Sequence, residues 1–217
     1  MPGGQYSTTL AAVAGAMPSG LRERKKLDTR RALSDAAMEL AFERGLENIT
    51  RDHIADRAGV SLRTFSNYFA GKYEALAYRQ TERIRRSMTV FRERPSDEPL
   101  WAAISAAMLE PLVSEGVDEM APTRKQLAEV RKLVLAPATR AAISKDVFAD
   151  WIRVIAERTG TDPVHDLYPR LVAAVVRAVV EAATDAYVVA DPPVPITSML
   201  RRGLADVAAG LPEGRTT

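Results

Sequence analysis

The segment formed by residues 50–69, TRDHIADRAGVSLRTFSNYF, restricts the possible folds of this chain more than any other. Thr50 stands where a helix N-cap belongs, because its hydroxyl can accept a hydrogen bond from a backbone N–H of the first turn. Gly59 allows the positive φ of a tight turn, and Ser61 is placed to cap a second helix. Ala55 is small enough for the second helix to cross close to the first. The pattern therefore predicts two short helices joined as a helix-turn-helix.

The second of these helices, residues 61–68, has an apolar side and a polar side. Its apolar side contributes to a small core, which consists of Ile54, Val60 and Phe65, completed by Leu62 or Phe69. Its polar side carries Arg63, Thr64, Ser66, Asn67 and Tyr68. A helix that served only the core would not present so many polar side chains. We therefore expect this side to contact a polar, negatively charged partner.

Double-stranded DNA is the partner that this polar side suits best. Arg63 can donate paired hydrogen bonds to the edge of a guanine in the major groove. Thr64, Tyr68 and the backbone amides near Ser61 can hold phosphates and fix the register. Residues 21–31, LRERKKLDTRR, contain six basic and two acidic side chains. Such a run alone is typical of a solvated helix face, but beside a helix-turn-helix it favours DNA binding.

A third helix is predicted before this pair, over residues 29–44, because apolar residues recur there at spacings of three and four. Its buried face consists of Ala32, Leu33, Ala36, Ala37, Leu40 and Ala41. Gly45 is expected to end it as a left-handed cap. Residues 1–20 have no positive charge before their weakly apolar centre, as an export signal would need, and are expected to form a disordered extension. The predicted DNA-binding domain is residues 21–71.

At this point residues 45–76 resemble the DNA-binding module of the TetR family of bacterial repressors. The resemblance is carried by Gly45, Thr50, Ile54-Ala55, Ala58-Gly59-Val60-Ser61, Thr64-Phe65, Tyr68-Phe69 and Lys72. It implies that Lys72, at the start of a fourth helix, touches a phosphate, as Thr64 and Tyr68 do, while Arg63 faces the bases. Tyr73 departs from the family pattern, which often has an acidic residue there; Glu74 can take that role. The residues predicted to contact DNA are Thr50, Ser61, Leu62, Arg63, Thr64, Ser66, Asn67, Tyr68 and Lys72.

The rest of the chain, residues 72–217, is also predicted to be helical, so the fold class is all-α. A long connecting helix is expected from Lys72 to the residue before Pro95, and two helices are expected to meet near Pro137. The segments 166–190 and 196–210 are apolar on several sides. A second subunit can cover them in a four-helix bundle, and two-fold symmetry would match a palindromic operator. The alternative is that both helices fill one large core.

A small-molecule site is predicted in this larger, ligand-binding and dimerisation domain. The residues expected to line it are Trp101, Met108, Leu112, Leu127, Arg131, Trp151, Ile155, Arg177 and Tyr187. Arg131 and Arg177 interrupt apolar surroundings and can meet a carboxylate or phosphate, or pair with neighbours such as Glu129 and Glu181. The stretches RTFSNYF and TRRALSDAAMELAFERGL are more particularly similar to actinobacterial TetR proteins. That similarity implies a fatty acyl-CoA or another long apolar effector.

Other classes of protein fit the sequence less well. The chain has no cysteine and two distant histidines, so neither a metal site nor a cofactor is expected. No apolar run is long enough to cross a membrane, and a cytoplasmic location is expected. No phosphate-binding loop or nucleophile elbow is present, so an enzyme is not expected. We therefore expect a ligand-responsive DNA-binding repressor. The alternatives are a constitutive DNA-binding regulator and, less favoured, an all-helical enzyme.

Overall fold

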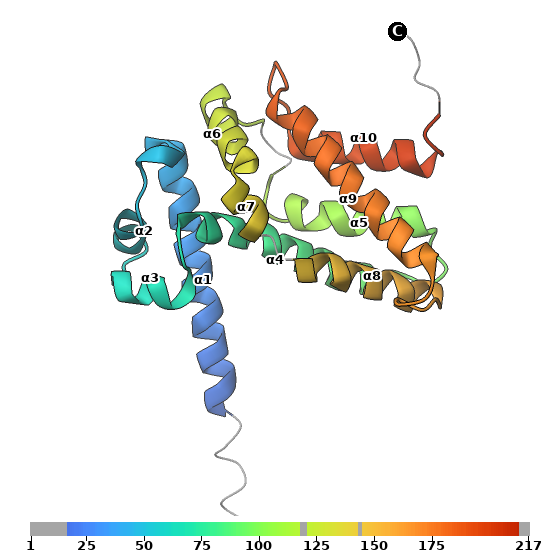
Figure 1. Cartoon of the computed structure of the whole chain (residues 1–217), viewed down its shortest axis with the longest axis horizontal. Helices are drawn as coiled ribbons and strands as arrows, with labels where there is room; N and C mark the ends of the chain where they lie inside the picture. Colours follow the sequence, from blue (N-terminus) through green and yellow to red (C-terminus); the bar gives the residue numbers. More distant parts are fainter. Residues whose placement is uncertain (1–16, 118–120, 143–144, 213–217) are drawn as a thin grey trace, which may run out of the picture.

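The computed structural model describes residues 17–117, 121–142 and 145–212, and every regular element in these ranges is a helix (Figure 1). The helices are α1 Met17–Arg44, the short 3-10 helix η1 Leu46–Asn48, α2 Arg51–Arg57, α3 Leu62–Tyr68, α4 Lys72–Glu93, α5 Leu100–Val113, α6 Arg124–Leu135, α7 Pro137–Ala142, α8 Lys145–Thr159, α9 Leu167–Val188 and α10 Ile196–Ala208. The predicted all-α fold is confirmed.

Helices α1, α2 and α3 form a small unit at one end of the molecule, and α4 runs from this unit into the larger group of helices (Figure 1). The core of the small unit includes Leu33, Leu40, Ile54 and Phe65, each at most 1% exposed. Leu76 and Tyr78 of α4 belong to the same core. The connecting helix is thus packed into the unit it leaves.

Helix α1 begins at Met17, earlier than the apolar pattern indicates. The last four residues of the expected disordered extension are therefore helical, while residues 1–16 lie outside the described part of the chain. Residues 20–28 are exposed all round, so no buried stripe marks these turns in the sequence. Ala32, which was expected on the buried face, is exposed; the other five predicted core positions of this helix are buried.

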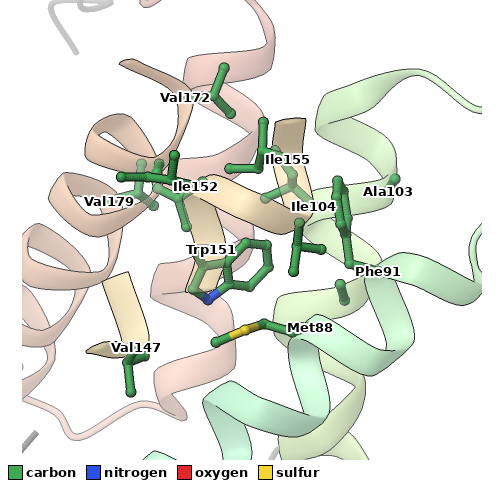
Figure 2. Packing of buried hydrophobic residues seen from close by; sticks show 14 of the residues in the cluster. Met88, Phe91, Ala103, Ile104, Val147, Trp151, Ile152, Ile155, Val172 and Val179 are labelled. Carbon is green, nitrogen blue, oxygen red and sulfur yellow. The ribbon is translucent and has the colours of Figure 1, made fainter. Parts of the chain in front are cut away.

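A second core lies among α4, α5, α8, α9 and α10. Trp151 stands at its centre, with Met88, Phe91, Ile104 and Ile155 around it (Figure 2). The ring centroids of Phe91 and Trp151 lie 5.7 Å apart. These side chains fill the space in which a ligand was expected.

The segment around Pro137 contains three helices, not the two that were expected. Helix α6 starts with a capping box between Thr123 and Gln126 and ends before Ala136. Pro137 then opens the separate short helix α7, because proline suits the first position of a helix but cannot continue one. Helix α8 follows from Lys145.

Helices α9 and α10 pack together closely. A Cβ atom added to Gly203 of α10 would lie 3.0 Å from Cγ1 of Val179 on α9, so the small residue permits the contact. The other side of α9 stays apolar and uncovered: Leu167 is 74% exposed and Leu171 is 53% exposed. Within the described residues, no helix is long and apolar enough to span a bilayer.

Candidate nucleic-acid interface and ligand site

The turn between α2 and α3 has the geometry that the sequence predicts. The hydroxyl of Thr50 accepts a hydrogen bond from the backbone N–H of His53 at 3.3 Å, and Ser61 accepts from that of Thr64 at 3.1 Å. Gly59 has a φ of 68°. The N–H of Val60, which packs against the core, donates to the Ala55 carbonyl at 2.9 Å and closes the turn. These bonds fix the direction in which α3 leaves the turn.

Helix α3 buries Phe65, and the residue that caps its C-terminal end, Phe69, is buried as well; their ring centroids lie 6.0 Å apart. The sequence left open whether Leu62 or Phe69 completes this core. Phe69 does, because Leu62 is 39% exposed. Arg63, Ser66 and Asn67 are exposed, as expected for residues that meet DNA.

Thr64 and Tyr68 were expected on the exposed side of α3, but both are half-buried. The hydroxyl of Thr64 lies 2.9 Å from that of Ser61 at the start of the helix. The ring of Tyr68 lies 5.9 Å from the guanidinium of Arg30 on α1, within the range of a cation–π contact. Both side chains therefore sit at the edge of the polar side, where phosphates rather than bases are expected.

Lys72 has a structural role that the sequence did not indicate. Its ammonium group donates to the carbonyl of Leu46 at 2.9 Å and to that of Ile49 at 3.3 Å. An ammonium group has three donors, so one remains for a phosphate. Lys72 thus ties the start of α4 to the segment that leads into α2.

Two further groups position the interface, and neither is among the residues predicted from the sequence. The guanidinium of Arg57 on α2 pairs with Glu43 at 2.6 Å and with Glu39 at 3.2 Å, both on α1. The hydrogen bond to Arg57 lowers the pKa of the Glu43 carboxyl, and its bonds to Glu43 and Glu39 raise the pKa of Arg57. The second group is Glu129, which belongs to the larger domain.

Glu129 on α6 is 8% exposed and connects the two domains. Its carboxylate accepts a hydrogen bond of 2.7 Å from the backbone N–H of Leu46, and another of 2.7 Å from the ammonium of Lys132. The bond from Leu46 is the main cause of the lowered pKa of Glu129. The Leu46 peptide is thus held at its N–H by Glu129 and at its carbonyl by Lys72. The pattern that could have revealed Glu129 is one charged residue on the apolar side of a predicted helix.

The residues predicted to line a ligand site are divided among several environments. Trp101, Met108, Trp151 and Ile155 belong to the second core or pack against it, while Leu112 belongs to a smaller cluster with Leu200 of α10. Leu127 is buried and Tyr187 is half-buried, and burial raises the pKa of the Tyr187 hydroxyl.

The two arginines of the predicted ligand site are exposed instead of facing the apolar interior. Arg131 lies on the outer side of α6. Arg177 pairs with Glu181 at 3.7 Å, and its guanidinium lies 4.9 Å from the centre of the Phe148 ring. An arginine one helical turn from a glutamate forms such a pair without any ligand.

Two cavities in the described part of the chain lie away from these residues. One, of about 350 Å³, is lined by α4 and α8 and includes Met88, Arg92 and Arg153. The other, of about 260 Å³, is lined by α1, α4 and the segment after α5. Neither contains a residue of the predicted ligand site.

The protein has a small three-helix unit with a polar helix after a glycine turn, and this unit is joined to a larger helical domain. This arrangement is that of helix-turn-helix transcriptional regulators. The family described as "Bacterial regulatory proteins, tetR family" matches residues 33–77, and "MftR C-terminal domain", also a TetR-type family, matches residues 98–212. The chain belongs to the TetR family of transcriptional regulators, whose members bind DNA operators as dimers.

Curated relatives agree with this assignment. The chain is 32% identical over 165 residues to the HTH-type transcriptional regulator TcmR of Streptomyces glaucescens, covering 74% of this chain and 73% of TcmR. It is 26% identical over 132 residues to the HTH-type transcriptional regulator PksA of Bacillus subtilis (strain 168), covering 61% of this chain and 59% of PksA. Both relatives are transcriptional regulators.

Solved structures show the same fold. The fatty acid degradation regulator FadR from Bacillus halodurans has a TM-score of 0.56 at 19% identity, covering 85% of this chain and 96% of that one. Thermus thermophilus FadR, a TetR-family repressor solved in complex with lauroyl-CoA, has a TM-score of 0.54 at 19% identity, covering 87% of this chain and 98% of that one.

Proposed function

We propose that this protein is a homodimeric repressor that leaves its operator when a small apolar or acyl-type effector binds. The observation that carries the DNA-binding part is the polar side of α3, where Arg63, Ser66 and Asn67 are exposed above a core formed by Phe65 and Phe69. Arg63 would read a base, while Thr64, Tyr68 and the third donor of Lys72 would hold phosphates. Thr50 and Ser61 would fix the register through the two helix N-termini.

The apolar side of α9 supports the dimeric state. Leu167 and Leu171 lie one turn apart on α9, and Val189 directly follows its last residue; each is more than half exposed. Exposed leucines and valines of this kind favour an interface. Pairing α9 and α10 with the same helices of a second copy would bury it in a four-helix bundle and place two α3 helices on the two halves of a palindrome.

An acyl-type effector is supported by the fold shared with the FadR that binds lauroyl-CoA. The effector would enter between α4, α5 and α8, where Trp151 and Ile155 now fill the core. It would have to prefer a conformation in which α4 is tilted and the two α3 helices are spread, since only a difference in affinity shifts the equilibrium.

A constitutive DNA-binding regulator is the second candidate, and the packing of the second core favours it. Ile104 and Ile155 are fully buried, and Trp151 is 6% exposed at the centre of the cluster (Figure 2). A protein without an effector needs no cavity there. The two candidates share the DNA-binding surface and differ in their response to ligand.

Native mass spectrometry of the gently purified protein tests the dimer and the effector together. The proposal expects a dimer that carries an additional mass, whose release and mass analysis identify the effector class. An empty dimer calls for titration of acyl-CoAs against the protein bound to DNA. If no acyl-CoA or other apolar ligand weakens DNA binding, the constitutive alternative is supported instead.

Selection from a random DNA library tests the DNA-binding part and also supplies the operator. The expected result is an enriched palindrome with half-sites about one helical turn, roughly 34–36 Å, or a multiple of it apart. Enrichment of a single half-site would contradict the proposed dimer. Failure to enrich any sequence would contradict the role of α3.

A further inference from the structure

The cavity of about 260 Å³ beside α1 and α4 is lined by three arginines and three carboxylates, namely Arg31, Arg79 and Arg86 with Asp35, Glu82 and Glu115. Three more arginines contact this lining from outside: Arg30 lies against Tyr78, Arg83 pairs with Glu115 and Arg85 pairs with Glu82. Arg30 and Arg31 belong to α1, the other four arginines to α4, and Glu115 to the segment between α5 and α6. The cavity thus lies where the DNA-binding unit, the connecting helix and the larger domain meet.

Glu115 receives more hydrogen bonds than a carboxylate can satisfy well. Its Oε2 is approached by Nε and an Nη of Arg79 at 3.3 and 3.2 Å, and by the same two atoms of Arg83 at 2.9 and 2.7 Å. Arg86 donates to its other oxygen. A carboxylate offers about four lone pairs, whereas three guanidinium groups carry about fifteen N–H donors. Even with Asp35, which accepts one bond from Arg79 at 2.7 Å, donors remain in excess.

Polar atoms buried beside the cavity also lack partners. Ser34 is 2% exposed and Tyr78 is 8% exposed; both line the cavity, and neither hydroxyl has a hydrogen-bond partner among the described residues. Nε of Arg30 is likewise buried and unpartnered, and its guanidinium lies 5.9 Å from the centre of the Tyr78 ring. A buried polar group without a partner destabilises the folded protein, so three together indicate a place for a hydrogen-bonding ligand.

We propose that this cavity binds a small oxyanion, a phosphate or carboxylate group, at the joint between the two domains. The oxyanion would accept from Arg86 and Arg31 and from the hydroxyls of Ser34 and Tyr78, and it would relieve the competition for Glu115. The guest is a second ligand, distinct from the apolar effector, because the cavity contains none of the residues predicted for that effector. Its size suits a compact anion rather than a long chain.

Calorimetric titration of the full chain with inorganic phosphate, at constant pH and ionic strength, tests the site. Saturable binding of one phosphate per chain is expected. Arg86→Gln should weaken it about tenfold or more, because a charge-assisted hydrogen bond is lost. If Arg86→Gln does not fold, Arg31→Gln, at an exposed position, replaces it and should likewise weaken phosphate binding. The matched control is Arg92→Gln, a half-exposed arginine of α4 that pairs with Glu157 and should leave phosphate binding unchanged.

Two further variants separate ligand binding from a purely structural role. Glu115→Gln removes a competing negative charge and should tighten phosphate binding. Ser34→Ala should weaken it by a few-fold without lowering thermal stability, because the hydroxyl has no partner in the unliganded protein. Titration with acetate distinguishes the two kinds of group: comparable affinity would assign the site to a carboxylate, and much weaker binding would assign it to a phosphate.

Several results would overturn the proposal. These are non-saturable binding to the wild-type protein, unchanged affinity in both arginine variants, or weaker binding in Glu115→Gln. Loss of phosphate binding in Arg63→Ala would place the ion on the DNA-binding face and would equally overturn it.

Discussion

Arg63 projects from α3 into solvent, where we propose that it reads a base. Replacing it by Ala should cost about 1–3 kcal/mol of operator affinity, or roughly a 5- to 150-fold rise in Kd, because a bidentate contact to a guanine is lost. The loss should be confined to one base position per half-site. Binding to the selected operator and to its single-base variants, measured by fluorescence anisotropy, checks this.

Arg153→Ala is the matched control for Arg63, because Arg153 is an exposed arginine of α8 that pairs with Asp150. It should bind every sequence as the wild type does. If Arg63→Ala keeps both the affinity and the base preference of the wild type, α3 reads DNA through other residues.

Glu129 provides a test of the link between the domains. Glu129→Gln should lower the free energy of unfolding by about 1 kcal/mol at pH 7, because a neutral amide replaces the charged acceptor of the Leu46 N–H. The folded-state pKa of Glu129 lies below its ordinary value near 4.5. The contribution of the Glu129 charge to the free energy of unfolding is therefore complete above pH 4.5, and it disappears as the pH falls through the folded-state pKa. Urea unfolding at several pH values should show the two proteins converging in acid.

Lys132→Ala is the control for Glu129, since it removes only a half-exposed ion pair and should change the stability little. Equal stability of wild type and Glu129→Gln at pH 7 would show that the negative charge on the acceptor of the Leu46 N–H contributes nothing measurable.

At the scale of elements, the α2–α3 turn depends on Gly59. A Cβ atom there would meet no atom within 4 Å, so any cost of substitution comes from the φ of 68° alone. Gly59→Ala should destabilise the protein by about 1–2 kcal/mol, and Gly59→Asn by less, because asparagine tolerates the left-handed region better. Thermal unfolding checks both. Gly71→Ser, at an N-cap with extended backbone, should be neutral or slightly stabilising; equal losses at both glycines would contradict the argument.

The elements could be predicted from the sequence wherever a local signal marks them. The helix-turn-helix was predicted correctly because its signals are local. Thr50 and Ser61 each accept a hydrogen bond from the N–H three residues further on, and Gly59 adopts the positive φ of the turn. The first turns of α1 and the separate helix α7 were missed, because one has no buried stripe and the other is only six residues long.

Contacts between segments far apart in the chain could not be predicted from local sequence patterns. The bond from Leu46 to Glu129 joins residues 83 positions apart, and the three arginines around Glu115 are 29 to 36 positions from it. Of the two partners that the sequence left open for Arg177, a ligand or Glu181, the structure contains the ion pair with Glu181, a neighbour on the same helix. The residues proposed to contact DNA or an effector remain predictions.

At the scale of the whole molecule, the uncovered side of α9 is the surface through which we propose that two subunits pair. Leu171→Glu should convert the proposed dimer into a monomer, because each subunit loses the burial of a leucine worth about 1.5–3 kcal/mol and gains a charge in the interface. The dimer dissociation constant should rise more than a hundredfold. Sedimentation velocity measures this, and the affinity for the palindrome should fall with it.

Leu21→Glu is the matched control, since Leu21 is 60% exposed on α1, outside the proposed interface. It should remain dimeric. A wild-type protein that sediments as a monomer, or a Leu171→Glu variant that stays dimeric, would exclude α9 as the interface.

Helix α4 passes without interruption from the DNA-binding unit into the larger domain. Because it is long, a small rotation at one end produces a large displacement at the other. At 1.5 Å per residue, its 22 residues span about 33 Å. A rotation of about 5° around its C-terminal end would carry Lys72 through about 3 Å, close to the 3.4 Å rise of one base pair. A small rearrangement near Phe91, at the C-terminal end of α4, would then displace the DNA-binding end of this helix by nearly the rise of one base pair.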